Sequence, residues 1–296
     1  MFDTILVPLD GSPAAERALA YVALLPSRRA RLLQVFPDIT EWFHPSEPLL
    51  DAWRTGRADD AADYLWRVAA PLRQQGREVD VAWAFGDPAA EIVAAARDAD
   101  LIAMTTHGRG MAERVLLGSV ADRVARHAAT PTLLVRAGAH SVREAAIARL
   151  VVPLDGSPLA EQALPVAADL GKALAVPLRL IRALDVDLLR AVILAGPAAA
   201  AAYAAAEADL EREAAQELDA RAAALRRRDL AVTTEIRHGG PIPALLAAIR
   251  PDDLVVLTSH GRGGLGRWLL GSVAEQLIRR AAGPVLLVRA RPAAGG

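Results

Sequence analysis

The strongest constraint on this chain is that the same succession of motifs runs through it twice. Residues 7–13 read VPLDGSP, and residues 152–158 repeat them letter for letter. The segments HGRG, LLGSV and a closing LLVR also occur twice, in the same order. The separation is 145 residues at the start (7 to 152) and 153 residues from HGRG onward (107 to 260). In a chain of 296 residues, such a duplication predicts two domains of the same fold, at 1–140 and 146–292.

Each copy alternates short apolar runs with helix signals. Ile5–Leu9 is continuously apolar, as expected of a parallel strand that is covered on both faces. Ser12 and Pro13 then supply an N-cap and a first helical residue. Later runs in the first copy predict strands at 31–36, 78–84, 101–105 and 133–136, and a helix near 59–74. This alternation predicts a doubly wound parallel α/β sheet in each copy.

Composition excludes several classes of function. The net charge of −1 gives no general attraction to nucleic acid or to an anionic membrane. Without cysteine there is no disulfide, no thiolate nucleophile and no sulfur-ligated metal. The start of the chain lacks a basic signal-peptide region, and the uncharged run 191–206 is too short to span a bilayer. We therefore expect a cytoplasmic protein with neither a nucleic-acid nor a membrane partner.

Ligands of an open parallel sheet bind at the carboxyl ends of its strands. Three features should meet there in each copy: an aspartate after the first strand, the end of the second strand, and a glycine loop after the fourth. The loop leads to a Gly-Ser pair that opens a helix, and such a helix start presents N–H donors to an anion. The alternative is that the glycines only make turns, the serine only caps its helix, and the aspartate only forms a turn.

These motifs resemble the universal stress protein family in its tandem form. The resemblance rests on ILVPLDGS at 5–12, LVVPLDGS at 150–157, THGRG…LLGSV and SHGRG…LLGSV, and it covers nearly the whole chain. Nucleotide-binding members of that family show G-x2-G-x9-G-[ST], whose second part fits residues 108–119 and 261–272. The first glycine is replaced by Thr105 and Thr258, whose β-branch narrows the approach to a ligand.

The resemblance implies two Rossmann-like domains of the adenine-nucleotide-binding type, each a five-stranded parallel sheet of order 3-2-1-4-5 with helices on both faces. It implies binding of ATP (or AMP or ADP) in each domain, with Mg²⁺ held mainly through phosphates. The aspartates would contact the adenosine part, the backbone at the end of the second strand would read the adenine edge, and the glycine loop would hold phosphates. The implied residues are Pro8, Leu9, Asp10, Val35, Thr105, His107, Gly108, Arg109, Gly110, Gly118, Ser119 and Val120, with Pro153, Leu154, Asp155, Ala183, Thr258, His260, Gly261, Arg262, Gly263, Gly271, Ser272 and Val273 in the second copy.

We expect a stress-response regulator or sensor that binds nucleotide and acts on an unknown protein partner. His107 and Ser119 do not predict catalysis, because the glycine loop gives both a simpler use, and the histidines show no metal-ligand spacing. Two alternatives stay open: a nucleotide-independent interaction module and an ATP-cleaving enzyme.

The fifth apolar run of each copy, 133–135 and 286–288, would be a sheet edge. We therefore expect the two copies to pair through these runs as an intramolecular pseudo-dimer, and a homodimer is a further possibility. The linker at 137–148 is long enough to allow this pairing. The aromatic stretch of Trp42, Phe43 and Trp53 could be a lid, an interface anchor or ordinary packing on the sheet.

Overall fold

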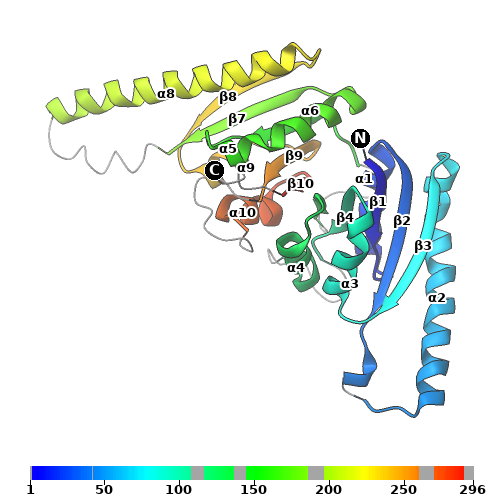
Figure 1. Ribbon diagram of the computed structural model, residues 1–296. Coiled ribbons are helices and arrows are strands. Elements are labelled where there is room, and N and C mark those ends of the chain that lie inside the picture. Colours follow the sequence, from blue (N-terminus) through cyan, green and yellow to red (C-terminus); the bar gives the residue numbers. More distant parts are fainter. Residues whose placement is uncertain are drawn as a thin grey trace, which may run out of the picture. The chain divides into compact units, whose positions relative to one another are not determined.

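The computed structural model describes residues 2–41, 43–107, 117–136, 145–185, 197–259 and 270–289. The chain divides into two compact units, Met1–Ala145 and Ala146–Gly296. We call them unit 1 and unit 2. In each, helices cover both faces of a five-stranded sheet (Figure 1).

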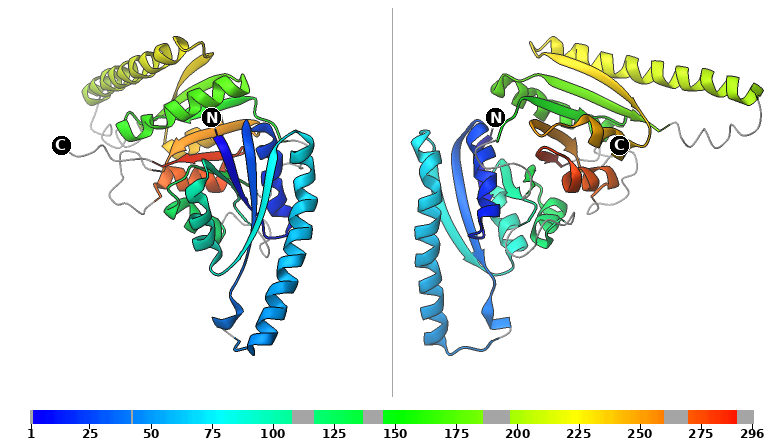
Figure 2. Two further views of the ribbon diagram at one scale, coloured as in Figure 1. Left: turned by 45° about the vertical axis from the view of Figure 1, so that its right-hand side comes forward. Right: turned by 180° about the vertical axis from the view of Figure 1, so that it is seen from behind.

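Unit 1 has the predicted strand order. Its strands are β1 (Phe2–Pro8), β2 (Ser27–Phe36), β3 (Glu78–Phe85), β4 (Leu101–Thr105) and β5 (Thr132–Val135). They lie in the order β3-β2-β1-β4-β5, and their four pairings are parallel. Its helices are α1 (Pro13–Leu24), α2 (Glu47–Gln74), α3 (Pro88–Ala95) and α4 (Ser119–His127), with short 3-10 turns η1 (Ile39–Glu41) and η2 (Ala96–Asp98). Right-handed crossovers place α1 and α2 on one face and α3 and α4 on the other (Figure 2).

Unit 2 repeats this arrangement. Its strands are β6 (Arg149–Pro153), β7 (Leu178–Leu184), β8 (Val232–His238), β9 (Asp253–Thr258) and β10 (Val285–Val288). Their order, β8-β7-β6-β9-β10, is again 3-2-1-4-5 in chain order, with parallel pairings. The helices are α5 (Pro158–Glu161), α6 (Ala163–Leu174), α8 (Pro197–Arg226), α9 (Pro241–Ala248) and α10 (Ser272–Arg280). The predicted α/β fold class is therefore confirmed.

The central strands are buried on both faces, as their continuous apolar runs predicted. Every residue of β4 and every residue of β9 is buried. On the helices, the buried side chains are small, such as Ala15, Ala18, Ala163 and Ala167, all at most 5% exposed. Alanine on the inner helix face allows close contact between helix and sheet.

The helix before β3 is longer than the sequence indicated. It was expected near residue 59, after a polar and aromatic connection, but α2 already begins at Glu47. The first turns of α2 carry exposed residues such as Leu49, so they show no amphipathic period. What they do have is a tertiary contact: the ring of Trp53 lies 5.4 Å from that of Phe85 on β3. Trp53 therefore packs on the sheet, whereas Phe43 is 57% exposed and Trp42 lies outside the described residues.

The first helix of unit 2 is broken where that of unit 1 is continuous. α5 ends at Glu161 and α6 begins at Ala163. Pro165 has no N–H to donate to the Glu161 carbonyl, so one helical hydrogen bond is missing at this place.

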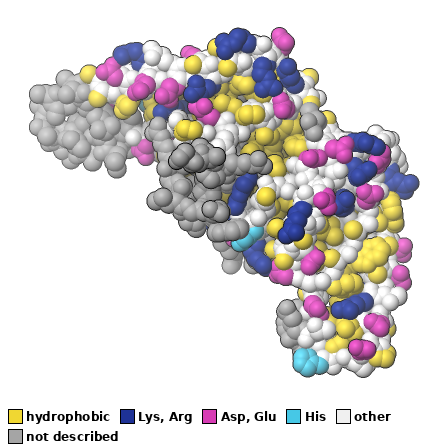
Figure 3. Space-filling view, in the orientation of Figure 1, with side chains coloured by type: hydrophobic (Ala, Val, Ile, Leu, Met, Phe, Trp, Pro, Cys, Tyr) yellow, Lys and Arg dark blue, Asp and Glu magenta, His cyan; other side chains and the backbone are white. Residues whose placement is uncertain are grey.

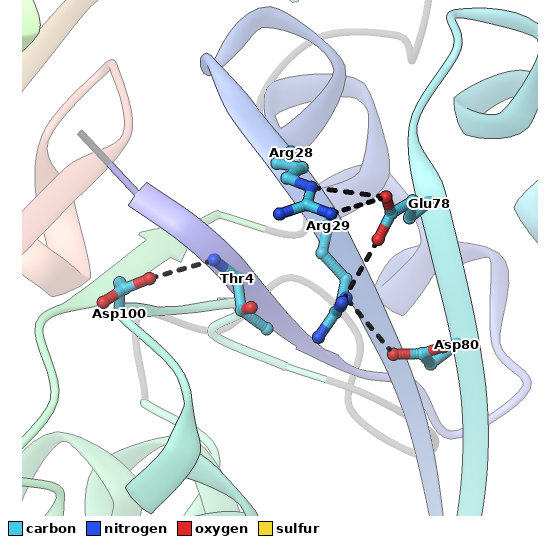
Figure 4. A network of polar contacts seen from close by, with 6 residues as sticks. All are labelled: Thr4, Arg28, Arg29, Glu78, Asp80 and Asp100. Atoms are coloured by element: carbon cyan, nitrogen blue, oxygen red, sulfur yellow. Dashed lines mark hydrogen bonds and ion pairs between the residues drawn. The ribbon is translucent and has the colours of Figure 1, made fainter.

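Polar contacts hold together the amino ends of the strands in unit 1, at the edge opposite the predicted site (Figure 4). The Thr4 N–H donates to Oδ2 of Asp100 at 2.9 Å, which joins β1 to the start of β4. Arg28 and Arg29 of β2 both donate to the carboxylate of Glu78 on β3. Arg28, Arg29 and Glu78 are partly or largely exposed, so their ion pairs fix strand register more than they add stability.

Candidate functional site

An aspartate follows the first strand of each unit and forms a turn. Oδ1 of Asp10 accepts from the N–H and the hydroxyl of Ser12, at 2.9 and 2.6 Å. Oδ1 of Asp155 accepts from the Ser157 N–H at 2.9 Å. In unit 1, Gly11 lies between Asp10 and Ser12 and has a φ of +82°, which residues with a side chain rarely adopt. The turn role that the sequence left open is therefore present, and it holds each carboxylate at the carboxyl end of its first strand.

The end of the second strand presents backbone groups beyond the end of the first. Leu33 accepts from the Leu9 N–H at 2.8 Å, and Phe36 accepts from the Gly86 N–H at 2.9 Å. The backbone N–H and C=O groups of successive residues in a strand point alternately to its two neighbouring strands. Those of Val35 therefore point, like those of Leu33, to the side of β1, beyond its last residue Pro8. In unit 2 the Leu154 N–H donates to the Ile181 carbonyl, which points to the side of β6. The backbone groups of Ala183, two residues later, point to the same side. These are the positions at which an adenine edge was expected.

In each unit, the residue before the last helix makes a backbone hydrogen bond to the residue that directly follows the fourth strand. Gly118 donates to the Thr106 carbonyl at 2.8 Å, and Thr106 donates to Val135 of β5 at 2.8 Å. In unit 2, Gly271 donates to Ser259 at 2.9 Å and Ser259 donates to Val288 at 3.0 Å. These bonds fix the amino ends of α4 and α10 at the carboxyl edge of the sheet.

These two helix starts, like that of α9, have a glycine N-cap and lack the side-chain cap found at three other helices. Ser12, Ser157 and Asp87 cap α1, α5 and α3 with side-chain oxygens. α4 and α10 instead have glycine at the N-cap and no side-chain cap bond, and Ser119 and Ser272 are their exposed first residues. The serines are thus not the caps that the alternative interpretation supposed. The first N–H groups of α4 and α10 remain available to an anion.

Unit 2 contains a cavity of about 580 Å³ at this edge, which we call the unit 2 cleft. This volume lies within the range of about 300–1,000 Å³ that small-molecule sites occupy. Eight of the residues predicted from the sequence line it: Pro153, Leu154, Asp155, Ala183, Thr258, Gly271, Ser272 and Val273. The structure therefore gathers the first strand end, the second strand end and the start of α10 around one space.

The sequence missed the far wall of the unit 2 cleft. Leu210 and Glu213 of α8 line it, together with Leu245 of α9. Leu210 is 44% exposed. Its distance in sequence from every motif gave no reason to place it at the site. The one signal in the sequence was a leucine between two acidic residues.

Part of the predicted site lies outside the described residues. This holds for Gly108, Arg109 and Gly110 in unit 1 and for His260, Gly261, Arg262 and Gly263 in unit 2. Thr105, which replaces the first glycine of the motif, donates its hydroxyl to the His107 carbonyl at 2.9 Å. Burial, followed by the charge of Arg136, lowers the pKa of His107, so its imidazole is neutral at pH 7. A neutral imidazole adds no charge for a phosphate.

Unit 1 has a smaller cavity, of about 270 Å³, beside Gly11. Its lining includes Gln34, Tyr64 and Arg67, none of which the sequence singled out. We call it the Gln34 cavity.

The described residues hold neither a metal cluster nor a membrane span. No group of three or more His, Asp or Glu side chains among them is arranged to hold a metal ion. In the same part of the chain, no helix combines the length and apolar character needed to cross a bilayer. On the face shown in Figure 3, acidic and basic side chains of the described residues are intermingled.

Comparison with known proteins gives one consistent family. The model of the "Universal stress protein family" matches residues 1–136 and 147–289. Universal stress protein Rv2005c of Mycobacterium tuberculosis strain H37Rv is 27% identical over 297 residues, covering 96% of this chain and 96% of that protein. Universal stress protein Rv2623 of the same strain is 28% identical over 295 residues, with 96% of each chain covered.

A solved structure shares the whole fold. The crystal structure of a universal stress protein from Archaeoglobus fulgidus DSM 4304 matches with a TM-score of 0.73 at 22% identity. The match covers 97% of this chain and 98% of that one. Both units and their succession are therefore found together in another protein.

Proposed function

The chain belongs to the universal stress protein family, and we propose that it binds adenine nucleotide in both of its units, without rapid turnover, as a regulator of a protein partner. The observation that carries the proposal is the unit 2 cleft. Its volume, its position at the carboxyl ends of the strands and its eight predicted lining residues fit a nucleotide.

The phosphate end is supported by the start of α10. Its glycine N-cap leaves backbone N–H groups available, and the aligned peptide dipoles add a partial positive charge. Thr258, Ser259 and Ser272 add hydroxyl groups to the same lining. A magnesium ion would be held through the phosphates, since the described residues offer no carboxylate cluster for it.

The adenosine end is supported by the opposite part of the unit 2 cleft. Asp155 is positioned there by its turn, where a carboxylate accepts from ribose hydroxyls. The N–H and C=O of Ala183 offer one donor and one acceptor beyond the end of β6, which suits an adenine edge. Ile181, Leu245 and Leu257 supply an apolar wall for the base.

The proposal is tested by titration calorimetry of the nucleotide-free protein with ATP, ADP and AMP, with and without Mg²⁺. Ser272→Asp and Ser119→Asp each place a carboxylate at the start of one helix. Such a charge favours the helix but repels a phosphate at the same place. We expect each variant to lose one of two binding events and to keep its folding stability.

Ser46→Asp is the matched control, because it puts the same charge at the start of α2, outside the lining of the unit 2 cleft. It should keep both events. We also expect the remaining site of Ser119→Asp, in unit 2, to bind at least as tightly as that of Ser272→Asp. Absence of saturable binding by the unaltered protein would instead support a nucleotide-independent module. Phosphate release at about 1 s⁻¹ or faster would support an ATP-cleaving enzyme.

A further inference from the structure

The outer edge of the unit 1 sheet is β3, and no described strand pairs with its outer side. The N–H of Gly86 points inward, since it donates to a carbonyl of β2. Backbone groups alternate along a strand, so the N–H and C=O groups that point outward belong to Val79, Val81, Trp83 and Phe85. Such an edge can accept a further strand, and proteins usually protect it with charges, proline or a bulge. All four outward residues of β3 are instead apolar.

The side chains of these residues lie on the face of the sheet that α2 covers. The ring of Trp53 on α2 lies 5.4 Å from that of Phe85. Because side chains alternate between the two faces of a strand, Trp83 lies on the same face as Phe85. Trp83 is nevertheless 39% exposed, and Figure 3 shows hydrophobic side chains over the boundary between β3 and α2. The open edge therefore carries exposed aromatic surface beside its free backbone groups.

One flank of α2 faces this open edge. Leu65 is buried against the sheet, and on a helix of 3.6 residues per turn Tyr64 and Trp66 project about 100° to either side of it. Tyr64 lies on the flank that lines the Gln34 cavity, towards Gly11 and β1. Trp66, which is 44% exposed, therefore lies on the opposite flank, towards β3 and beyond. We call this second side the outer flank of α2.

The outer flank is complementary to a second copy of itself. Helical spacing places on it Asp59, Ala62, Trp66, Ala70 and Arg73, at intervals of three, four, four and three residues. A second α2 running in the opposite direction would set Trp66 against its equivalent and alanine against alanine. It would also set Asp59 against Arg73 of the second copy, in both directions. The guanidinium of Arg73 is held 5.3 Å from the centre of the Trp66 ring, at the border of this surface.

The β3 strand is complementary to itself in the same sense. An antiparallel pair centred on Ala82 sets Val81 opposite Trp83 of the second copy. It likewise sets Val79 opposite Phe85, so all four outward residues exchange hydrogen bonds. Pairs of a β-branched and an aromatic residue stabilise antiparallel strands. On the other face, the carboxylates of β3 meet alanine or glycine rather than each other.

The equivalent edge of unit 2 lacks these features. β8 corresponds to β3 at a spacing of 153 residues, as the glycine after each strand donates to the end of the second strand. At this spacing, Asp219 stands in place of Trp66, and Thr234 stands in place of Val81. The Thr234 hydroxyl donates to the Asp219 carboxylate at 2.9 Å. A charged group here protects the edge of unit 2, whereas the edge of unit 1 is aromatic.

We propose that two copies of this chain associate through the open edge of unit 1, with β3 antiparallel to β3 and α2 antiparallel to α2 about one twofold axis. Paired strands lie about 4.8 Å apart, so two helices that each cover β2 and β3 come within about 10 Å, the packing distance of helices. Strand pairing and helix pairing therefore fit one twofold arrangement. This surface lies apart from the unit 2 cleft and from the fifth strands, and it does not rest on the function proposed above.

The test is sedimentation velocity of the full-length protein over a range of concentrations, where we expect a reversible equilibrium of monomer and dimer. Trp66→Asp introduces the residue type of unit 2, and Val81→Pro removes one outward N–H, which an edge strand tolerates. Each should weaken dimerisation by roughly tenfold or more. Leu49→Asp and Thr234→Pro are the matched controls, on another side of α2 and on the edge of unit 2. Both should leave the dimer unchanged.

A charge reversal tests the pairing of the two α2 helices. Asp59→Arg and Arg73→Asp should each weaken the dimer, because like charges then face each other, and the double variant should restore it. Within one helix these residues are about 21 Å apart, so only a second copy can produce the rescue. Circular dichroism checks that each variant is folded.

Three results would overturn the proposal. The first is a protein that stays monomeric at every concentration. The second is normal dimerisation of Trp66→Asp and Val81→Pro. The third is a double charge variant that associates no better than the single ones.

Discussion

The N–H of Gly118 donates to the carbonyl oxygen of Thr106 at 2.8 Å, and a Cβ built on Gly118 would stand 2.8 Å from that same oxygen. A backbone oxygen cannot move aside as a side chain can, and real Cβ atoms essentially never come so close. The hydrogen bond that fixes the start of α4 therefore requires glycine at this position. Gly271 makes the equivalent bond to Ser259 in unit 2.

Gly118→Ala is expected to destabilise unit 1 by about 1–3 kcal/mol, the usual cost of overpacking a tight contact. Urea unfolding followed by circular dichroism measures the change. Gly56→Ala is the control, because nothing lies within 4 Å of a Cβ there. That control should gain up to about 1 kcal/mol from helix propensity. Equal behaviour of the two variants would contradict the steric argument.

Arg149→Met is expected to cost about 3–5 kcal/mol of stability in unit 2, because it leaves a buried charge without its partner. Asp253 is 1% exposed and accepts two bonds from Arg149, at 2.7 and 3.0 Å. Arg28→Met removes one of the two arginine partners of an exposed carboxylate, Glu78, and should hardly change the free energy of unfolding (Figure 4). Chemical denaturation of both variants decides it, and a larger loss in Arg28→Met would refute the prediction.

Asp87 should make unit 1 sensitive to acid. The hydrogen bond from Arg123 at 2.6 Å, and then that from the Ala90 N–H at 2.8 Å, lower the pKa of Asp87. A carboxylate whose pKa is lower in the folded than in the unfolded state stabilises the folded protein fully at pH values above its unfolded pKa. That stabilisation is lost as the pH falls through the folded pKa.

Unfolding experiments between pH 7 and pH 2.5 should show a smaller acid-dependent loss in Asp87→Asn than in the unaltered protein. The amide keeps a capping oxygen but cannot be protonated in this range. Asp87→Ala should cost about 1 kcal/mol at pH 7, because it removes the cap of α3. Identical pH profiles for the unaltered protein and Asp87→Asn would assign the acid sensitivity to other groups.

The two halves should associate when expressed separately. Residues 133–135 and 286–288 are apolar and come last in the strand order of their units. We predict that they pair, because an uncovered apolar edge favours addition of another strand. Sedimentation of fragments 1–140 and 146–296, alone and mixed, measures this. Fragments that remain monomeric after mixing would argue against the pseudo-dimer.

Much of the fold could be predicted because it is encoded in local patterns. The apolar runs, the Ser-Pro helix starts and the internal repeat identified all ten strands to within a few residues. The start of α2 could not be predicted in this way. Its first turns are exposed, and the contact that supports them, between Trp53 and Phe85, joins residues of two different elements.

The site shows the same division. Repeated motifs named Asp155, Thr258 and Gly271, because turn and glycine-loop chemistry requires particular residues at fixed spacing. Leu210 and Glu213 could not be named, since they reach the unit 2 cleft only because α8 packs against β7 and β8.

The sequence by itself determined that there are two copies of one α/β fold, the order of elements in each, and the turns and helix starts at the carboxyl ends of the strands. Each of these follows from neighbouring residues. Only the tertiary structure decided that Arg182 and Glu217 form an ion pair, whereas Oε1 of Gln34 is buried without a hydrogen-bond partner among the described residues. The reason is physical: whether a buried polar atom is satisfied depends on side chains that the chain brings together from distant elements.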